Sequence, residues 1–230
     1  MGPHRVAGER AAPFARLLAT PGVEEVFVPR GRFGFMAFHG GALEEITDVI
    51  AGAAAAAADA SYYGVHQPAD LQWHIPSSEI DPAASPALAA FLDQVDHVVT
   101  VHGYGRAGLW STLLLGGRNR ELAAHVGHHL RRHLPVYEVE TDLAAIPAEL
   151  RGLHPRNPVN LVRGGGTQLE LPPRVRGTTP MFWDWEGPEL NPHTQAVVDA
   201  LAEAARSWMP LDEGSGREAL DHPGGSAAVA

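Results

Sequence analysis

The sequence predicts an α/β domain whose largely parallel sheet is covered on both faces. Strand-like and helix-like segments alternate through most of the 230 residues, which is the order typical of α/β domains. Residues 33–39 read Phe-Gly-Phe-Met-Ala-Phe-His. This run has no polar alternation before its last residue, as expected of a central strand buried on both faces. A chain of 24.5 kDa is also long enough to bury a sizeable core.

Apolar runs bounded by glycine or proline predict the strands. Pro29 closes the first run, a glycine pair follows the second, and glycines also follow the third and fourth. The last run alternates between polar and apolar residues, which indicates two different faces. The expected strands cover residues 26–29, 33–39, 96–102, 113–115, 136–139 and 167–171.

Apolar residues at helical spacing and capping residues predict the helices. Ser85 before Pro86 and Asn191 before Pro192 are typical helix starts, and Asn119 is a good N-cap for a long amphipathic helix. Pro147 interrupts the shortest helical segment, residues 143–150. The expected helices cover residues 43–58, 86–95, 120–134, 143–150 and 192–208. We expect one domain over residues 1–211. Residues 212–230 are polar and glycine-rich, which predicts a disordered tail.

Composition excludes several classes of function. The formal charge is −10 and all 17 basic residues are arginines, so a duplex-binding surface is not expected. The chain has no cysteine, which excludes thiolate zinc sites and cysteine nucleophiles. No apolar run approaches the ~20 residues of a membrane span, and the first residues lack the pattern of a secretory signal. We expect a cytoplasmic protein without nucleic-acid or membrane partners; release from the cell and the oligomeric state stay open.

Two of the expected strands end in histidine, at His39 and His102, and each histidine is followed by glycine. Parallel strands end at the same edge of a sheet, so both imidazoles would project there. Glu44 follows His39 after a Gly-Gly turn, at the expected start of the next helix. Two imidazoles and one carboxylate form the His₂Glu set of catalytic zinc sites, which predicts one zinc ion per chain. The alternative is that the histidines are ordinary core groups and that Glu44, like Glu45, only complements the helix dipole.

Glu170 is the candidate general base. It lies in the alternating run Gln168-Leu169-Glu170-Leu171, so its side chain would leave the sheet on the face opposite the two leucines. A carboxylate near apolar walls has a pKa that is easily raised toward neutral. Such a group can take a proton from water and return it to a leaving group. The alternative is an edge strand whose polar face is solvated.

Seven segments in order resemble the zinc-dependent poly-γ-glutamate hydrolases, a family found in phages and bacteria. They span residues 34–177 and read FHGGALEEITDVIA, SYYG, WHIPSSEIDP, VVTVHGYG, LLLGGRNRELA, HPRNPVN and GGGTQLEL. The resemblance implies a three-layer α/β/α fold with a mixed, mostly parallel sheet, similar to the zinc carboxypeptidases. It also implies that His39, Glu44 and His102 hold the metal and that Glu170 is the base.

The family's substrate is a γ-linked amide polymer rich in carboxylates, so the resemblance requires local positive charge. Arg156 is our candidate for a carboxylate or oxyanion contact, and Asn157 is expected to orient the substrate or support a ligand. Ile46 and Asp48 stand within the segment that reads Gly-Thr-Ser-Glu in the family, and Glu79 replaces a family histidine. If Asp48 or Glu79 faced the cleft, its charge would repel a polyanion and favour a smaller or less acidic amide.

His125, His129 and His133 recur along one helical face. We interpret this face as solvated, although it has the spacing of a transition-metal site. The sequence as a whole predicts a zinc-dependent amidohydrolase acting on poly-γ-glutamate or a related acidic amide. The alternatives are a carboxypeptidase or N-acyl amino acid deacylase on the same fold, and a non-catalytic metal-dependent binding protein.

Overall fold

The computed structural model describes residues 12–178 and 190–209, and the expected tail over residues 212–230 lies outside them. Within these ranges one mixed sheet has seven strands in the order β1-β3-β2-β4-β7-β5-β6. In chain order the strands are β1 (Glu24–Val28), β2 (Phe33–Gly41), β3 (Ser61–Gln67), β4 (His97–Gly103), β5 (Thr112–Leu115), β6 (Glu138–Glu140) and β7 (Gly166–Leu171). The central strands β3, β2, β4 and β7 are parallel, whereas β1 and β5 are antiparallel to their inner neighbours.

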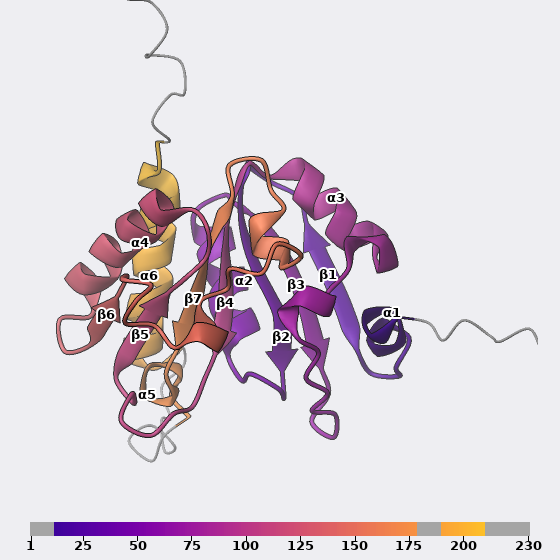
Figure 1. The fold of residues 1–230 in the computed structure, drawn as a ribbon, viewed down its shortest axis with the longest axis horizontal. Helices are drawn as coiled ribbons and strands as arrows, with labels where there is room; N and C mark the ends of the chain where they lie inside the picture. The colour runs from indigo at the N-terminus through magenta and orange to yellow at the C-terminus, as the bar shows by residue number, and fades with distance from the viewer. Residues whose placement is uncertain (1–11, 179–189, 210–230) are drawn as a thin grey trace, which may run out of the picture.

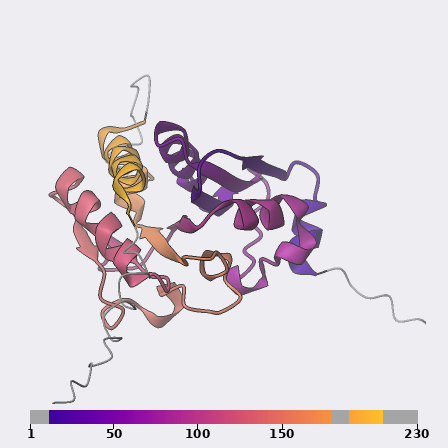
Figure 2. The same cartoon turned by 90° about the horizontal axis from the view of Figure 1, so that it is seen from above.

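Helices cover both faces of this sheet, so the predicted three-layer α/β/α fold is confirmed (Figures 1 and 2). One face carries α2 (Thr47–Ala57), α4 (Arg120–His133) and α6 (Pro192–Ser207). The other face carries α1 (Pro13–Leu18) and α3 (Pro86–Gln94). The four-residue helix α5 (Pro173–Arg176) follows β7. No helix in the described ranges has both the length and the apolar character needed to cross a membrane.

Strand β2 is the buried centre that its composition predicts. Phe35 and Ala37 pack into the core beneath α2, α4 and α6. Met36 and Phe38 point the other way, into the core beneath α1 and α3. Because successive side chains of a strand alternate between faces, a strand covered on both sides needs apolar residues at every position. This explains why the segment lacks polar alternation.

Two predicted helices differ from the structure, and one strand was not predicted. The helix expected from residue 43 begins only at Thr47, because Ile46 has a positive φ of 74° and cannot be part of a right-handed helix. Of the helix expected over residues 143–150, only the 3₁₀ turn Ala148–Leu150 forms, because proline cannot occupy a helix interior. Strand β3 was not among the expected elements, although it pairs with both β1 and β2.

The histidine face of α4 packs against α6, so our interpretation of it as solvated is wrong. His129 is buried, His125 Nε2 lies 3.0 Å from the carbonyl oxygen of Ala204, and His133 Nε2 lies 2.7 Å from Glu203. Within the described ranges, this face does not present three ligands at the spacing of a metal group. The sequence predicted a helix over residues 192–208 but not that this helix packs against the histidine face of α4.

Candidate active site

The carboxyl ends of β2, β4 and β7 lie side by side at the centre of the sheet. His102 on β4 pairs directly with Glu170 on β7. The chain leaves β2 for β3 through α2 on one face, and then crosses to β4 on the other side of β2 through α3 on the opposite face. Such a change of direction opens a crevice at the strand ends, where α/β proteins bind their ligands.

His39, Glu44 and His102 converge at this edge. The Nδ1 atom of His39 lies 2.8 Å from Glu44 Oε1, and the Nδ1 atom of His102 lies 3.1 Å from Glu44 Oε2. The two imidazole rings are 5.0 Å apart between centroids. His39 is 2% exposed and His102 is 3% exposed, so one carboxylate joins two buried imidazoles. The structure thus brings together the three residues for which the sequence predicts a metal site.

The turn after β2 carries Glu44 back toward the strand ends, although Glu44 precedes α2 rather than starting it. A register irregularity in the pairing with β3 falls between Ala37 and Gly40, next to His39, and such bulges re-aim side chains. Gly41 has a φ of 69°, and a Cβ there would lie 2.2 Å from the carbonyl oxygen of Gln67, so only glycine fits. The amide of Glu44 then donates to the carbonyl of His39 at 2.9 Å.

The donor set fits a bound cation. His39 Nε2 lies 2.8 Å from the carbonyl oxygen of Ile75, which can only accept, so Nε2 carries the proton and Nδ1 of the neutral ring presents a lone pair. That lone pair faces the Glu44 carboxylate, another acceptor, and the contact requires a proton or a metal ion between them. A backbone carbonyl that fixes the outer nitrogen of a histidine is typical of metal ligands. Without a metal ion, burial disfavours the Glu44 carboxylate, but positive charge on the two histidines outweighs this and holds the pKa of Glu44 far below its usual range.

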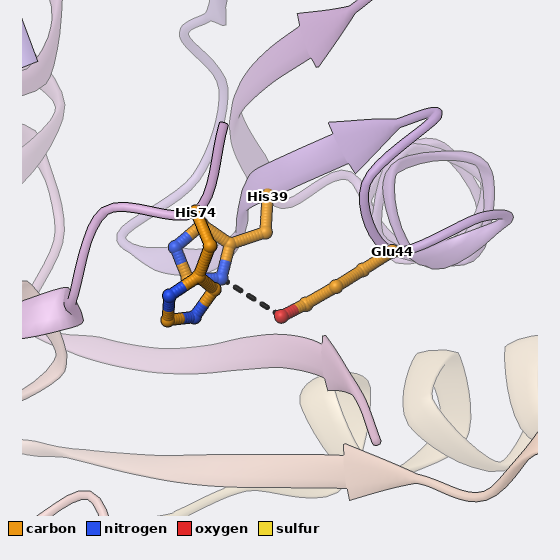
Figure 3. Close-up of side chains that lie close together, drawn as sticks. All are labelled: His39, Glu44 and His74. Carbon is orange, nitrogen blue, oxygen red and sulfur yellow. Dashed lines mark hydrogen bonds and ion pairs between the residues drawn. The ribbon is translucent and has the colours of Figure 1, made fainter. Parts of the chain in front are cut away.

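His74 is a further residue at this centre, and we did not identify it as a candidate from the sequence. Its ring lies 4.8 Å from that of His39 between centroids, and His39, Glu44 and His74 have the mutual spacing of a metal group. Figure 3 shows Glu44 reaching toward His39, with His74 beside the His39 ring. His74 lies on an irregular segment after β3, so neither strand-end position nor periodicity marked it. The resembling segment WHIPSSEIDP was the only signal.

Glu170 is buried beside this cluster, with 4% of its surface exposed. Burial raises the pKa of Glu170 to about 7. The side-chain amide of Gln168 donates to Glu170 Oε1 at 2.8 Å, and the amide of Asn157 donates to Gln168 Oε1 at 2.8 Å. This chain of hydrogen bonds fixes the orientation of the Glu170 carboxyl and leaves Oε2 free of Gln168. Asn157 therefore supports the Glu170 carboxyl through Gln168.

A cavity of about 460 Å³ opens over these groups, and its polar lining includes His39, Glu44, His74, His102, Asn157, Gln168 and Glu170. Arg156 instead lines a neighbouring cavity, which shares Ser78 with the first. Glu79 lines that neighbouring cavity as well. Asp48 lies on the far side of the Gly41–Ile46 turn, where its carboxylate contacts His66 at 2.8 Å. Neither acidic departure from the family pattern therefore faces the site cavity.

The raised pKa of Glu170 predicts a pH-dependent stability in the metal-free protein. A carboxyl whose pKa is higher in the folded state binds its proton more tightly there, so the free energy of unfolding falls as pH rises from 4.5 to about 7. This amounts to about 3 kcal/mol. Glu170→Gln removes the titration. We expect this variant to be more stable than the wild type above about pH 7 and similar to it below about pH 4.5, measured by urea unfolding with a chelator present.

Glu149→Gln is the matched control, because Glu149 lies at the cavity rim with an exposed carboxylate. Its difference from the wild type should not follow this pH course. A wild type that equals Glu170→Gln in stability at high pH would contradict the prediction.

Two solved structures share the fold, and a third is less similar. The structure of a bacteriophage poly-γ-glutamate hydrolase is 20% identical, with a TM-score of 0.66 over 79% of this chain and 87% of that chain. A structure described as YNDL-apo (zinc-free) is 18% identical, with a TM-score of 0.66 over 80% and 90% of the two chains. A putative carboxypeptidase from Burkholderia mallei is 11% identical, with a TM-score of 0.48 over 84% and 66%. No curated protein sequence matches significantly.

This chain therefore has the α/β fold of these structures, with a His-Glu-His cluster beside a buried carboxyl at the carboxyl ends of the central strands. The family follows from the sequence. The sequence model of the family described as poly-gamma-glutamate hydrolase matches residues 20–204, which is most of the chain. The protein belongs to this family. The predicted resemblance is thereby confirmed.

Proposed function

We propose that this protein is a zinc-dependent amidohydrolase that cleaves γ-glutamyl amide bonds of poly-γ-glutamate. One observation carries the proposal: two strand-end histidines contact the two oxygens of Glu44 in the same cavity as Glu170. His39, Glu44 and His102 would hold one zinc ion. When bound, zinc would lower the pKa of a water molecule and polarise the amide carbonyl.

Glu170 carries the proton through the reaction. With a pKa of about 7, its carboxylate takes a proton from the attacking water and gives it to the leaving nitrogen. The proton resides on Oε2, because Oε1 accepts from Gln168. Gln168 is held in turn by Asn157, so the amide that faces Glu170 presents N–H rather than C=O. The base is thereby oriented before substrate arrives.

The cavity favours cleavage within the polymer over removal of a terminal residue. Recognition of a chain-end carboxylate commonly uses arginine, which binds the carboxylate through a planar fork. No arginine lines the site cavity within residues 12–178 and 190–209. Arg156 lies one cavity further along, beyond Ser78, where it would contact a carboxylate of a substrate that extends past the scissile bond. Asp48 faces another cavity, and Glu79 lies outside the site cavity but lines the same neighbouring cavity as Arg156, so neither carboxylate lies in the cavity where the amide would be cleaved.

Incubation with poly-γ-glutamate tests this proposal. We expect the purified protein to contain one zinc ion per chain and to shorten the polymer rapidly by internal cuts, because the cavity does not select chain ends. A chelator should abolish cleavage and added zinc should restore it. Release of single glutamate units from an otherwise long polymer would favour the carboxypeptidase alternative, and zinc binding without cleavage of any γ- or α-linked amide would favour a binding protein.

A further inference from the structure

Arg176 reaches back from the end of α5 to three backbone carbonyls at the strand ends. Its Nε donates to the carbonyl of Leu171 at 3.2 Å, one terminal nitrogen donates to Glu45 at 3.2 Å, and the other donates to Tyr104 at 3.4 Å. The side chain is half-buried. All three guanidinium nitrogens are therefore engaged by main-chain carbonyls.

Each of these carbonyls belongs to a segment that carries a site residue. Glu45 directly follows Glu44, and Leu171 directly follows Glu170. Tyr104 is the second residue after His102. Three segments that are distant in sequence, the turn after β2, the end of β4 and the end of β7, are thus joined through one planar group.

The guanidinium also lies against the peptide that binds Glu44. The amide of Gly103 donates to Glu44 Oε2 at 2.9 Å. A Cβ on Gly103 would lie 2.8 Å from the Cζ atom of Arg176, so the absence of a side chain is what allows the close approach. The charge of Arg176 interacts with the carboxylates of Glu44, Glu45 and Glu170. The contacts and the charge of Arg176 therefore bear on both Glu44, the candidate metal ligand, and Glu170, the candidate base.

We propose that Arg176 is a positioning residue that holds the Glu44 turn and the ends of β4 and β7 in the arrangement needed for zinc binding. It is not a catalytic residue, because it lines the cavity behind the turn rather than the site cavity. Arginine is required at this position, because lysine has one nitrogen and cannot satisfy three diverging carbonyls in a plane. The inference rests on the proposed zinc-dependent function.

The test measures zinc affinity of the metal-free, full-length protein by competition with a chelator, in Arg176→Gln and Arg176→Lys. Loss of an outer partner of a metal ligand costs about 10- to 100-fold in affinity, and we expect a loss of this size in both variants. We also expect kcat to fall while KM for a γ-glutamyl substrate changes by less than about threefold, because the residue does not line the substrate cavity. Methylguanidinium ion added to Arg176→Ala should restore part of the zinc affinity.

Arg174→Gln is the matched control. Arg174 lies on the same short helix, but its guanidinium stacks over the ring of Tyr137 at 5.3 Å. This variant should keep wild-type zinc affinity. Unchanged affinity in folded Arg176→Gln or Arg176→Lys, or an equal loss in Arg174→Gln, would overturn the inference. A wild type that binds no zinc would instead refute the proposed function, so the two failures are distinguishable.

Discussion

Replacing Glu170 with glutamine is expected to reduce kcat for γ-glutamyl amide hydrolysis by about 10²- to 10⁴-fold, the usual contribution of a general acid-base group. Glutamine has nearly the same shape and can still accept from Gln168, but it cannot take up a proton. The three candidate ligands are untouched, so zinc content should stay at the wild-type value. Steady-state kinetics and metal analysis of the same preparation measure both quantities.

The control for Glu170→Gln is a variant of a second carboxylate at the same cavity. Glu149→Gln removes an exposed carboxylate at the rim of the same cavity and should retain wild-type kcat. Turnover in Glu170→Gln within about tenfold of the wild type would contradict the assignment of Glu170 as the base, since a group that contributes so little does not transfer the proton.

Replacing His102 with alanine should abolish zinc binding, whereas replacing His74 with alanine should preserve it. Both histidines lie beside the His39-Glu44 pair, and His74 has the better mutual spacing. We assign the third ligand to His102 because it is buried at a strand end and its Nδ1 directly contacts Glu44 Oε2. His74 lies on an irregular segment and contacts the His39 ring.

The measurement is zinc affinity of the metal-free variants, with circular dichroism as the control for folding. We expect a loss of more than about 100-fold for His102→Ala, because even the loss of an outer partner costs up to this much. For His74→Ala we expect a change of less than about tenfold, together with a weaker apparent affinity for substrate. The opposite ranking of the two variants would transfer the ligand role to His74.

The sequence predicted the features that depend on local chemistry. Apolar composition revealed β2, and the asparagine and serine caps located α4 and α3, whose N-caps accept from Leu122 and Leu88. His39 and His102 could be identified because each ends an expected strand and precedes glycine, which marks the carboxyl edge of the sheet. In the structure the strands continue slightly further, to Gly41 and Gly103. Glu170 could be identified from the alternation of polar and apolar residues in its strand, and the structure pairs it with His102.

What the sequence did not reveal depends on contacts between distant segments. The role of His74 requires knowing that the irregular segment after β3 folds over the end of β2. The role of Arg176 requires knowing that the turn after β2 and the ends of β4 and β7 meet around its guanidinium. The burial of His129 follows from the position of α6, and the location of Arg156 in a neighbouring cavity follows from the path of the loop after the 3₁₀ turn Ala148–Leu150. A sequence pattern over a few neighbouring residues does not show which distant segments will contact one another in the fold.

Strand β7 is hydrogen-bonded to β4 on one side and to β5 on the other. The strand that carries Glu170 therefore also joins the two parts of the sheet. A truncated polypeptide ending before Gly166 would keep every candidate metal ligand yet lose Glu170, the proposed base. It would also leave an open edge on β4 and detach β5 and β6 from the rest of the sheet. Loss of this one strand should therefore remove the proposed hydrolytic activity and the connection across the sheet together.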